Sequence, residues 1–188
     1  MDYEKYFPIR SLKLVPEIRV RSVVKTVQYP VSITNDNAPY ALPYWHSQAL
    51  ARFILDNPHT FVGQSVVDIG CGTGVAAIAA AMVGAQSLAL DPDLRCLEFT
   101  EQNASTNNVA VETVWADHRK IPDTDIVLAG GVFHEAHGPV IAEIARNKPS
   151  LIAVSEINLW DMDGFVEVAL HQMDKSTVRV FRSKHLAV

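Results

Sequence analysis

The chain has 188 residues, of which 48% are hydrophobic and 20% are charged, so it is expected to fold as a soluble globular domain with a buried core. A formal net charge of −5, without a run of lysine or arginine, argues against a nucleic-acid partner. The polar amino terminus and the lack of a long apolar run argue against a signal peptide and a membrane partner. The two cysteines imply no disulfide framework, and a cytoplasmic location is therefore expected.

Residues 1–46 are predicted to form an N-terminal extension to the main fold of residues 47–188, within a single domain. The alternation of Ile18–Arg21 and the β-branched stretch Val23–Ile33 predict one or two strands in this extension. The aromatic, proline-rich segment Pro39–Trp45 predicts an ordered loop. The main fold then begins with a helix.

This first helix is expected to run from Ser47, as its N-cap, through Asp56. Leu50 and Ile54 recur on one face at helical spacing, and Pro58 follows as a stop signal. The sequence therefore predicts an amphipathic helix directly before the first strand of the main fold.

The stretch Ser65–Asp93 predicts a strand, a glycine-rich turn, a helix and a second strand. Gly70, Gly72 and Gly74 allow positive φ and a close approach of the backbone to a ligand. The run Val75–Val83 has the composition and length of a buried helix. Such a turn is typical of a site for a nucleotide-type ligand.

The spacing in this turn favours S-adenosylmethionine (SAM) over a dinucleotide. The third glycine comes one residue too early for the Gly-x-Gly-x-x-Gly pattern of dinucleotide sites. Asp68 lies where its carboxylate would repel a pyrophosphate but attract SAM, which carries a sulfonium and an ammonium. Asp91 ends the next strand, where a carboxylate can accept hydrogen bonds from ribose hydroxyls. A nicotinamide cofactor is the more distant alternative.

Strands and helices continue to alternate after Asp91. Helices are expected over Pro92–Asn107, Ala136–Arg146 and Phe165–Met173, and strands over Val109–Trp115, Asp125–Ala129, Leu151–Ser155 and Thr177–Phe181. This alternation predicts an α/β fold with a doubly wound, mostly parallel, Rossmann-like sheet covered by helices on both faces. The ligand crevice is expected at the carboxyl ends of the strands.

Asp117 follows one of these strands and could accept a hydrogen bond from the amino group of an adenine. Trp115 or His118 could provide a stacking surface beside it. Packing in the core explains Trp115 equally well, and an exposed loop position explains His118 better.

The acid followed by Gly-x-Gly-x-Gly, with a second acid after the next strand, resembles the class I SAM-dependent methyltransferases. A more specific resemblance covers about residues 12–135. The segments Leu14–Val20, Pro43–Trp45, Gln48–Pro58 and Asp125–Gly130 resemble the lysine methyltransferases that modify the β subunit of electron transfer flavoprotein. The resemblance implies a methyltransferase fold with SAM as cofactor, and places Trp45 and Gln48 at the methionine end of SAM.

Together, these arguments predict one set of SAM-binding residues. It comprises Trp45, Gln48, Asp68, Gly70, Cys71, Gly72, Thr73, Gly74, Asp91, Pro92, Trp115, Asp117, Ala129 and Gly130.

The chain departs from this family in two places. The family carries Asp-x-Phe-Tyr after the catalytic strand, where this chain has Gly131-Val132-Phe133-His134, and we interpret the difference as favouring an acceptor other than lysine. The family fold also ends in a strand, a helix and a two-strand hairpin. Few residues follow Phe181, so a shortened C-terminus that lacks one edge strand is expected, with a homodimer through that edge as a hypothesis.

Methyl transfer to nitrogen needs an acceptor with a free lone pair, and a histidine suits removal of its proton. His134, with Glu135 beside it, is the predicted catalytic base or acceptor-orienting group, and Glu135 could instead take the role of the missing acid, displaced along the chain. The alternative is that these residues and His137 cap the following helix. No metal is expected, because no cysteine or third histidine accompanies His134 and His137.

The sequence therefore favours a SAM-dependent methyltransferase that methylates a nitrogen of a small molecule or a protein side chain. One alternative is a protein lysine methyltransferase of the electron transfer flavoprotein β type. Another is a SAM-binding protein that transfers no methyl group, either a regulatory subunit or a fold reused for another reaction.

Overall fold

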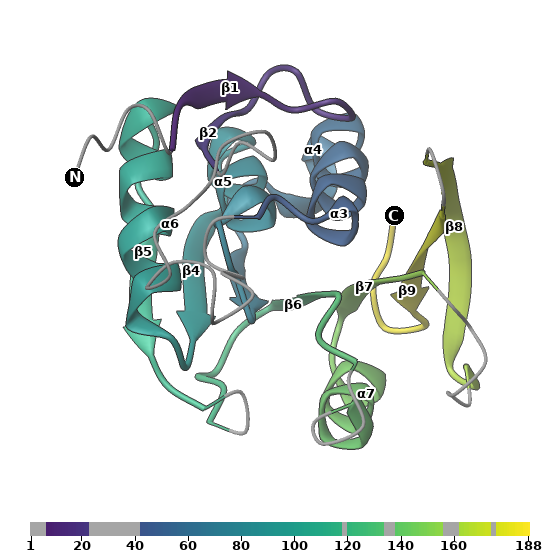
Figure 1. Cartoon of the computed structure of the whole chain (residues 1–188). Coiled ribbons are helices and arrows are strands. Elements are labelled where there is room, and N and C mark those ends of the chain that lie inside the picture. The colour runs from purple at the N-terminus through teal and green to yellow at the C-terminus, as the bar shows by residue number, and fades with distance from the viewer. Residues whose placement is uncertain (1–6, 23–41, 118–119, 134–137, 156–161, 174–175) are drawn as a thin grey trace.

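The computed structural model describes residues 7–22, 42–117, 120–133, 138–155, 162–173 and 176–188. Within these residues, a seven-stranded sheet has the strand order β5-β4-β3-β6-β7-β9-β8 (Figure 1). The strands are β3 (Ser65–Ile69), β4 (Gln86–Asp91), β5 (Glu112–Trp115), β6 (Ile126–Gly130), β7 (Ser150–Val154), β8 (Phe165–Gln172) and β9 (Thr177–Ser183). The first five are mutually parallel, and β9 is antiparallel to both β7 and β8. The predicted mostly parallel Rossmann-like sheet is confirmed.

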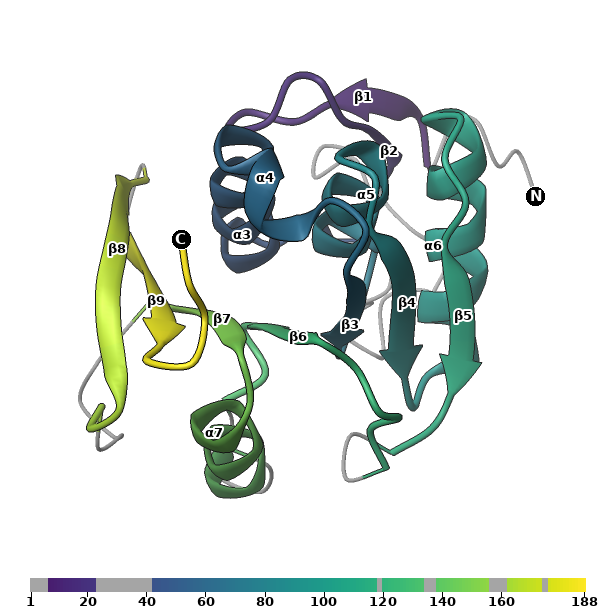
Figure 2. The same cartoon turned by 180° about the vertical axis from the view of Figure 1, so that it is seen from behind.

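The helices cover the two faces of this sheet unequally. The described helices are α3 (Trp45–Asp56), α4 (Pro58–Phe61), α5 (Val75–Met82), α6 (Leu94–Thr106) and α7 (Gly138–Asn147). Helices α3, α5 and α6 lie on one face, and α7 packs on β6 and β7 from the other (Figures 1 and 2). None of these helices, in the part of the chain that the structure describes, has the length and apolar character needed to cross a membrane.

The central strand β3 is buried because both faces of the sheet carry apolar clusters. Val66 packs into the cluster that contains α3 and α5, whereas Val67 and Ile69 pack into the cluster that contains α7. Buried parallel strands are continuous apolar runs for this reason. Helix α5 is apolar on all sides, and its first six residues are buried between α3 and the sheet.

The N-terminal segment forms a small antiparallel sheet of β1 (Ile9–Ser11) and β2 (Arg19–Arg21), which docks on α6. The amide of Arg21 donates to Asn103 Oδ1 at 2.7 Å, and Nδ2 of this buried asparagine donates to the carbonyl of Thr73 at 2.9 Å. Asn103 thus joins β2 to the glycine turn. Val15 and Ile18 lie in the main core, so the extension shares that core with the rest of the chain.

The predicted boundaries are confirmed to within a few residues for most elements. Strand β2 lies within the predicted stretch Ile18–Arg21, whereas β1 was not predicted and Val23–Ile33 lies outside the described residues. Helix α3 begins at Trp45 with Tyr44 as its N-cap, so Ser47 as the N-cap is wrong. The helix therefore crosses the predicted division between residues 46 and 47.

The predicted helix over Phe165–Met173 is wrong, because this segment forms strand β8. Val166 pairs with Arg182 and His171 with Val178, so β8 and β9 form an antiparallel hairpin. The hairpin is closed by the Met173 amide, which donates to the Ser176 carbonyl at 2.8 Å. The sheet therefore does not lack an edge strand, and the argument for a homodimer through a missing strand no longer applies.

Candidate functional site

The glycine-rich turn lies at the carboxyl end of β3, next to β4. Gly70, Gly72 and Gly74 have φ values of 64°, 56° and 77°, in the left-handed region that favours glycine. The amides of Gly70 and Cys71 both donate to the Leu90 carbonyl, at 2.8 and 3.2 Å, which ties the turn to β4. The fold therefore holds this stretch of backbone in one conformation.

A cavity of about 350 Å³ lies against this turn, at the carboxyl ends of β3, β4 and β6. This volume is within the range of small-molecule sites. Of the predicted SAM-binding residues, seven line the cavity: Gly70, Cys71, Gly72, Thr73, Asp91, Pro92 and Gly130. The prediction did not include eight further residues that line it, namely Leu42, Tyr44, His46, Ser47, Cys96, Gly131, Val132 and Ile141.

Asp91 is the carboxylate among the described residues that line this cavity. Its Oδ2 accepts the Gly72 amide at 3.1 Å and its Oδ1 accepts the Asp93 amide at 2.9 Å. Burial raises the pKa of Asp91, while these two amide donors act in the opposite direction. The Cys96 thiol also hydrogen-bonds to this carboxylate, so three of its roughly four acceptor positions are used and it can still accept a bond from a hydroxyl.

Asp68 is fully enclosed behind the turn and does not line the cavity. Its Oδ2 accepts the Ala77 amide at 3.2 Å, which ties β3 to α5. Burial, and to a smaller extent the negative charge of Asp91, raise the pKa of Asp68 from 3.8 to about 7. The carboxyl groups of Asp68 and Asp91 are therefore buried away from water, where their ionised forms are unfavourable. A cation bound nearby would make the ionised forms more favourable.

We expect Asp68→Asn to stabilise the SAM-free protein more at pH 8 than at pH 5. The folded state disfavours the ionised carboxylate. Its destabilising effect is absent below the ordinary pKa of 3.8, grows as the pH rises from there to about 7, and is complete above about 7. The raised pKa corresponds to a cost on the order of 2 to 4 kcal/mol at pH 8, and asparagine avoids this cost. Thermal unfolding of both proteins at the two pH values tests this.

The exposed Asp123→Asn is the control for the loss of one negative charge elsewhere on the surface. It should shift the midpoint of unfolding equally at pH 5 and pH 8. An equal shift for Asp68→Asn at the two pH values would contradict the assigned ionisation of Asp68.

The two cysteines at the cavity are unsuited to nucleophilic chemistry. Cys71 and Cys96 are both buried, and burial raises the pKa of each thiol far above its ordinary value. A thiolate is the reactive form, and it is disfavoured in such surroundings. The cavity therefore offers binding and orientation and no covalent nucleophile from these two residues.

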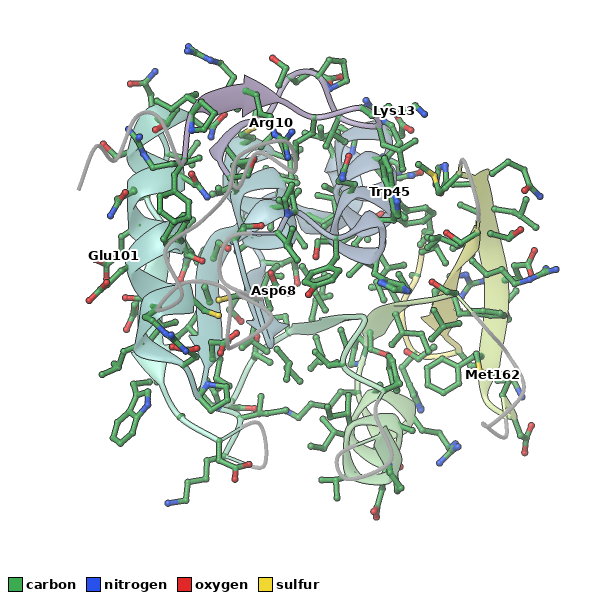
Figure 3. The ribbon with its side chains drawn as sticks, viewed as in Figure 1. Arg10, Lys13, Trp45, Asp68, Glu101 and Met162 are labelled. Atoms are coloured by element: carbon green, nitrogen blue, oxygen red, sulfur yellow. The ribbon has the colours of Figure 1, made fainter. Side chains whose placement is uncertain are left out.

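Trp45 and Gln48 are not among the described residues that line the cavity, and their place at the methionine end of SAM stays a prediction. Residues three apart share a helix face, and this face of α3 meets the N-terminal segment. The Lys13 ammonium lies 5.8 Å from the centre of the Trp45 ring (Figure 3). The side chain of Gln48 donates to the Pro43 carbonyl at 2.8 Å and accepts the Leu14 amide at 3.3 Å. The neighbouring residues, His46 and Ser47, face the cavity instead.

Four other predicted SAM-binding residues lie near the cavity without lining it. Trp115 is 66% exposed, and its indole Nε1 donates to the Pro92 carbonyl at 2.9 Å, so it braces the loop after β4. Ala129 is fully buried within β6, and Gly74 packs against Thr100. Asp117 follows β5, outside the cavity lining.

The predicted catalytic residues His134 and Glu135, and also His118, lie outside the described residues, and their roles remain predictions.

His46 is the histidine of the described cavity lining, and it is held between two strand ends. Its Nε2 lies 2.5 Å from Ser155 Oγ, directly after β7. Its ring also faces Gly131, directly after β6, which has a φ of 73°. The position of His46, two residues before Gln48 in the segment that resembles the lysine methyltransferases, is the signal that could have suggested it.

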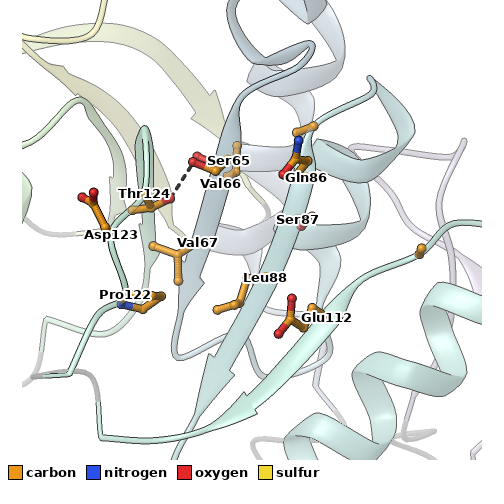
Figure 4. Close-up of a pocket in the computed structure, with 12 residues that line it drawn as sticks. Ser65, Val66, Val67, Gln86, Ser87, Leu88, Glu112, Pro122, Asp123 and Thr124 are labelled. Atoms are coloured by element: carbon orange, nitrogen blue, oxygen red, sulfur yellow. Dashed lines mark hydrogen bonds between the residues drawn. The ribbon is translucent and has the colours of Figure 1, made fainter.

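A second cavity, of about 460 Å³, lies at the amino ends of the parallel strands (Figure 4). Ser65, Gln86 and Glu112 are the first residues of β3, β4 and β5, and all three line it. The hydroxyl of Thr124 donates to the Ser65 carbonyl at 2.9 Å along one wall. Ligands of open α/β sheets bind at the opposite, carboxyl ends, so we assign the ligand site to the cavity beside the glycine turn.

The chemistry of that cavity fits a cationic nucleoside better than a diphosphate. None of its described lining residues is a lysine or an arginine, so no side-chain cation there would balance the charge of a diphosphate. The Asp91 carboxylate can accept a hydrogen bond from a ribose hydroxyl. Apolar surface is provided by Leu42, Val132 and Ile141. SAM, with its ribose and its positive charges, therefore matches the residues that are present.

Comparison with known proteins gives an independent result. Residues 49–135 match the family model described as ribosomal protein L11 methyltransferase (PrmA). The electron transfer flavoprotein β subunit lysine methyltransferase of Danio rerio is 34% identical over 136 residues, which cover 68% of this chain and 52% of that protein. The chain thus spans about half the length of this relative.

Solved structures support the fold over a longer part of the chain. The ribosomal protein L11 methylase from Lactobacillus delbrueckii subsp. bulgaricus has a TM-score of 0.61 at 15% identity and covers 94% of this chain and 100% of its own. The magnesium protoporphyrin IX methyltransferase from Synechocystis PCC 6803 with bound SAM has a TM-score of 0.58 at 14% identity, covering 84% and 86% of the two chains. At these identities the likeness concerns the fold alone.

Proposed function

Because the chain belongs to the class I SAM-dependent methyltransferases, in the group of the ribosomal protein L11 and electron transfer flavoprotein β methyltransferases, we propose that it transfers a methyl group from SAM to an amino group of a protein. The observation that carries this proposal is the cavity in which Asp91 and the glycine turn meet. A desolvated carboxylate that can accept a further hydrogen bond, beside a turn held in one conformation, suits a cation that carries a ribose.

The residues of the chain have separate tasks in this reaction. SAM, when bound, supplies a methyl group on a sulfonium that a nitrogen lone pair can displace. Asp91 would accept bonds from the ribose hydroxyls, and the buried Asp68 would add favourable charge from behind the turn. Val132 and Ile141 line the cavity with apolar surface that excludes water from the reacting atoms. Positioning and desolvation are the main contributions that the protein makes to such a displacement.

The relatives favour lysine as the acceptor, whereas the sequence pattern after β6 favoured another acceptor. The relative from Danio rerio is described as a lysine methyltransferase of a protein substrate, and the matched family model is described by a ribosomal protein substrate. Both names support a protein acceptor over a small molecule. We therefore place the protein lysine reaction first and the methylation of a small molecule second.

Incubation of the purified protein with SAM labelled on its methyl group and a cell lysate tests the proposal. We expect label in one or a few protein bands, and mass spectrometry of those bands should locate the methyl groups on lysine. Label confined to small molecules would support the second candidate. A protein that binds SAM but transfers no label would contradict methyl transfer and would support a regulatory or reused fold.

Asp91→Ala provides the matched negative control, because it removes the carboxylate of the proposed site. Glu98→Ala is the positive control, since Glu98 is an exposed acid on α6, the helix that follows Asp91. Labelled bands that persist with Asp91→Ala at full intensity would come from another methyltransferase in the lysate or from another site.

A further inference from the structure

Helix α6 carries three buried polar side chains along one side. Cys96, Thr100 and Asn103 recur at the spacing of one helix face, and all three are buried. A buried polar group costs free energy unless it has a hydrogen-bond partner, so the partners of these side chains show what they serve. We call these three side chains the polar stripe of α6.

Two members of the polar stripe are bonded to backbone carbonyls of the glycine turn. Thr100 Oγ1 donates to the Gly72 carbonyl at 3.3 Å. One helical turn later, Asn103 Nδ2 donates to the Thr73 carbonyl at 2.9 Å. The helix therefore holds two successive peptide units of the turn from one side.

The third member links the same helix to the carboxylate of the site. The Cys96 thiol is hydrogen-bonded to the Asp91 carboxylate. One helix thus contacts both the turn after β3 and the carboxyl end of β4, and it sets these two parts of the site relative to each other. Cys96 also lines the cavity, whereas Thr100 and Asn103 are not among the described residues of the lining.

The partner of Thr100 is not the usual one for a threonine in a helix. Thr106, the other threonine of α6, donates to the Gln102 carbonyl of its own helix at 2.8 Å. The hydroxyl of Thr100 leaves the helix for Gly72 instead, and it also lies 3.5 Å from Cys71 Sγ. The bond that Thr100 donates therefore serves the turn and not the helix.

The two bonds from α6 fix the direction of peptide planes that glycine leaves free to rotate. A trans peptide unit directs its carbonyl and its amide to opposite sides. Because the Gly72 and Thr73 carbonyls are held against α6, the amides that follow them are directed away from α6. The Gly74 amide accordingly donates to the Cys71 carbonyl at 2.8 Å, which closes the turn. The polar stripe thus decides which backbone groups of the turn are left for a ligand.

We propose that Thr100 and Asn103 are positioning residues for SAM, which hold the Gly72 and Thr73 peptide units in the orientation that receives the nucleoside. This inference rests on the proposed function. Both residues act through the turn, since neither belongs to the described lining of the cavity. Substitutions at these two positions therefore change the affinity for the nucleoside without changing the wall that contacts it.

Thr100→Val and Thr100→Ser separate positioning from support of the fold. Valine keeps the shape of threonine without its hydroxyl, whereas serine keeps the hydroxyl and loses a buried methyl group. We expect Thr100→Val to raise the Kd of S-adenosylhomocysteine (SAH), which is SAM without its transferable methyl group, at least about threefold, the effect of one hydrogen bond. Thr100→Ser should stay below this increase while lowering the midpoint of thermal unfolding. Isothermal titration calorimetry, at a temperature where each variant is folded, measures Kd.

The same helix offers a matched control for each position. Thr106→Val makes the same change as Thr100→Val at the hydroxyl that bonds within α6, and it should leave the Kd of SAH unchanged. Asn103→Leu should raise this Kd at least about threefold, because it removes the donor to the Thr73 carbonyl. Asn107→Leu should not, since Asn107 bonds to the Arg19 backbone of β2, at 2.6 and 2.9 Å.

The outcomes distinguish this inference from the proposed function. An increase in Kd below threefold for a folded Thr100→Val or Asn103→Leu overturns the role of that residue, and either variant decides alone if the other does not fold. Equal increases for Thr100→Val and Thr100→Ser also overturn it, because the affinity would then follow packing and not the hydroxyl. Failure of the wild-type protein to bind SAH at all would count against the proposed function itself.

Discussion

Asp91→Ala is expected to weaken the binding of SAM by about 2 to 3 kcal/mol, on the order of 30- to 150-fold in Kd. The variant removes the carboxylate that would accept a hydrogen bond from a ribose hydroxyl, and the energy of a hydrogen bond to a charged group sets this magnitude. It also frees the amides of Gly72 and Asp93, which Asp91 holds at 3.1 and 2.9 Å, and so loosens the turn. Calorimetric titration with SAM measures the change.

Two further variants, Asp91→Asn and Glu98→Ala, serve as comparisons for the affinity of Asp91→Ala. The asparagine keeps one oxygen as an acceptor and should give an intermediate loss of affinity, whereas the exposed Glu98 should have no effect. Thermal unfolding recorded in parallel shows whether each variant is folded at the temperature of titration. A Kd for Asp91→Ala within threefold of wild type would contradict the assignment of Asp91 to the ribose.

Gly74→Ala should lower the free energy of unfolding by about 2 to 4 kcal/mol. Two costs combine at this position. The φ of 77° is unfavourable for any residue with a side chain, and a Cβ would meet Thr100 Cγ2 at 2.6 Å and Oγ1 at 2.7 Å. Thr100 is fully buried on α6, so it has little room to move. Chemical denaturation of the purified protein measures the loss.

Gly63→Ala separates the two costs. Gly63 has a φ of 76°, close to that of Gly74, but a Cβ there would meet no atom within 4 Å. It should therefore lose only about 1 to 2 kcal/mol, from the backbone conformation alone. The double variant Gly74→Ala/Thr100→Ala should be more stable than the sum of the two single losses predicts. Equal losses at Gly63 and Gly74 would show that the contact with Thr100 is unimportant.

The sequence predicted those parts of the site in which one short stretch decides the structure. The turn between Gly70 and Gly74 needs positive φ at set positions, and the strand that ends at Asp91 is an apolar run, so both are local features. The alternation of strands and helices also fixed the order of most elements. These features depend on neighbours in sequence and can be recognised without the fold.

Strand β8 was predicted as a helix because its apolar residues suit either structure. Phe165, Val168 and Ala169 have helical spacing, and the strand is selected by pairing with β9, which includes Ala169 with Val180. Contacts between strands override local preference in this way. A prediction from the segment alone has no access to that pairing.

The orientation of α3 could not be predicted for a related reason. The segment around Trp45 and Gln48 lies beside the cavity, but the rotation of the helix decides which of its residues face the cavity. That rotation is set by the packing of the buried face of α3 on α5 and the sheet. Likewise, His46 and Ser155 are 109 residues apart in sequence, and only the sheet brings them together.

Asn103 has a further consequence for how the molecule responds to its cofactor. One buried side chain is bonded to both the Arg21 amide of β2 and the Thr73 carbonyl of the glycine turn. Energetic linkage between two sites is reciprocal, so a turn made rigid by a bound nucleoside would also make the N-terminal hairpin harder to detach. Conversely, detachment of β1 and β2 from α6 would lower the affinity for the cofactor. Strands β1 and β2 would then change the affinity for the cofactor without contacting the cavity that binds it.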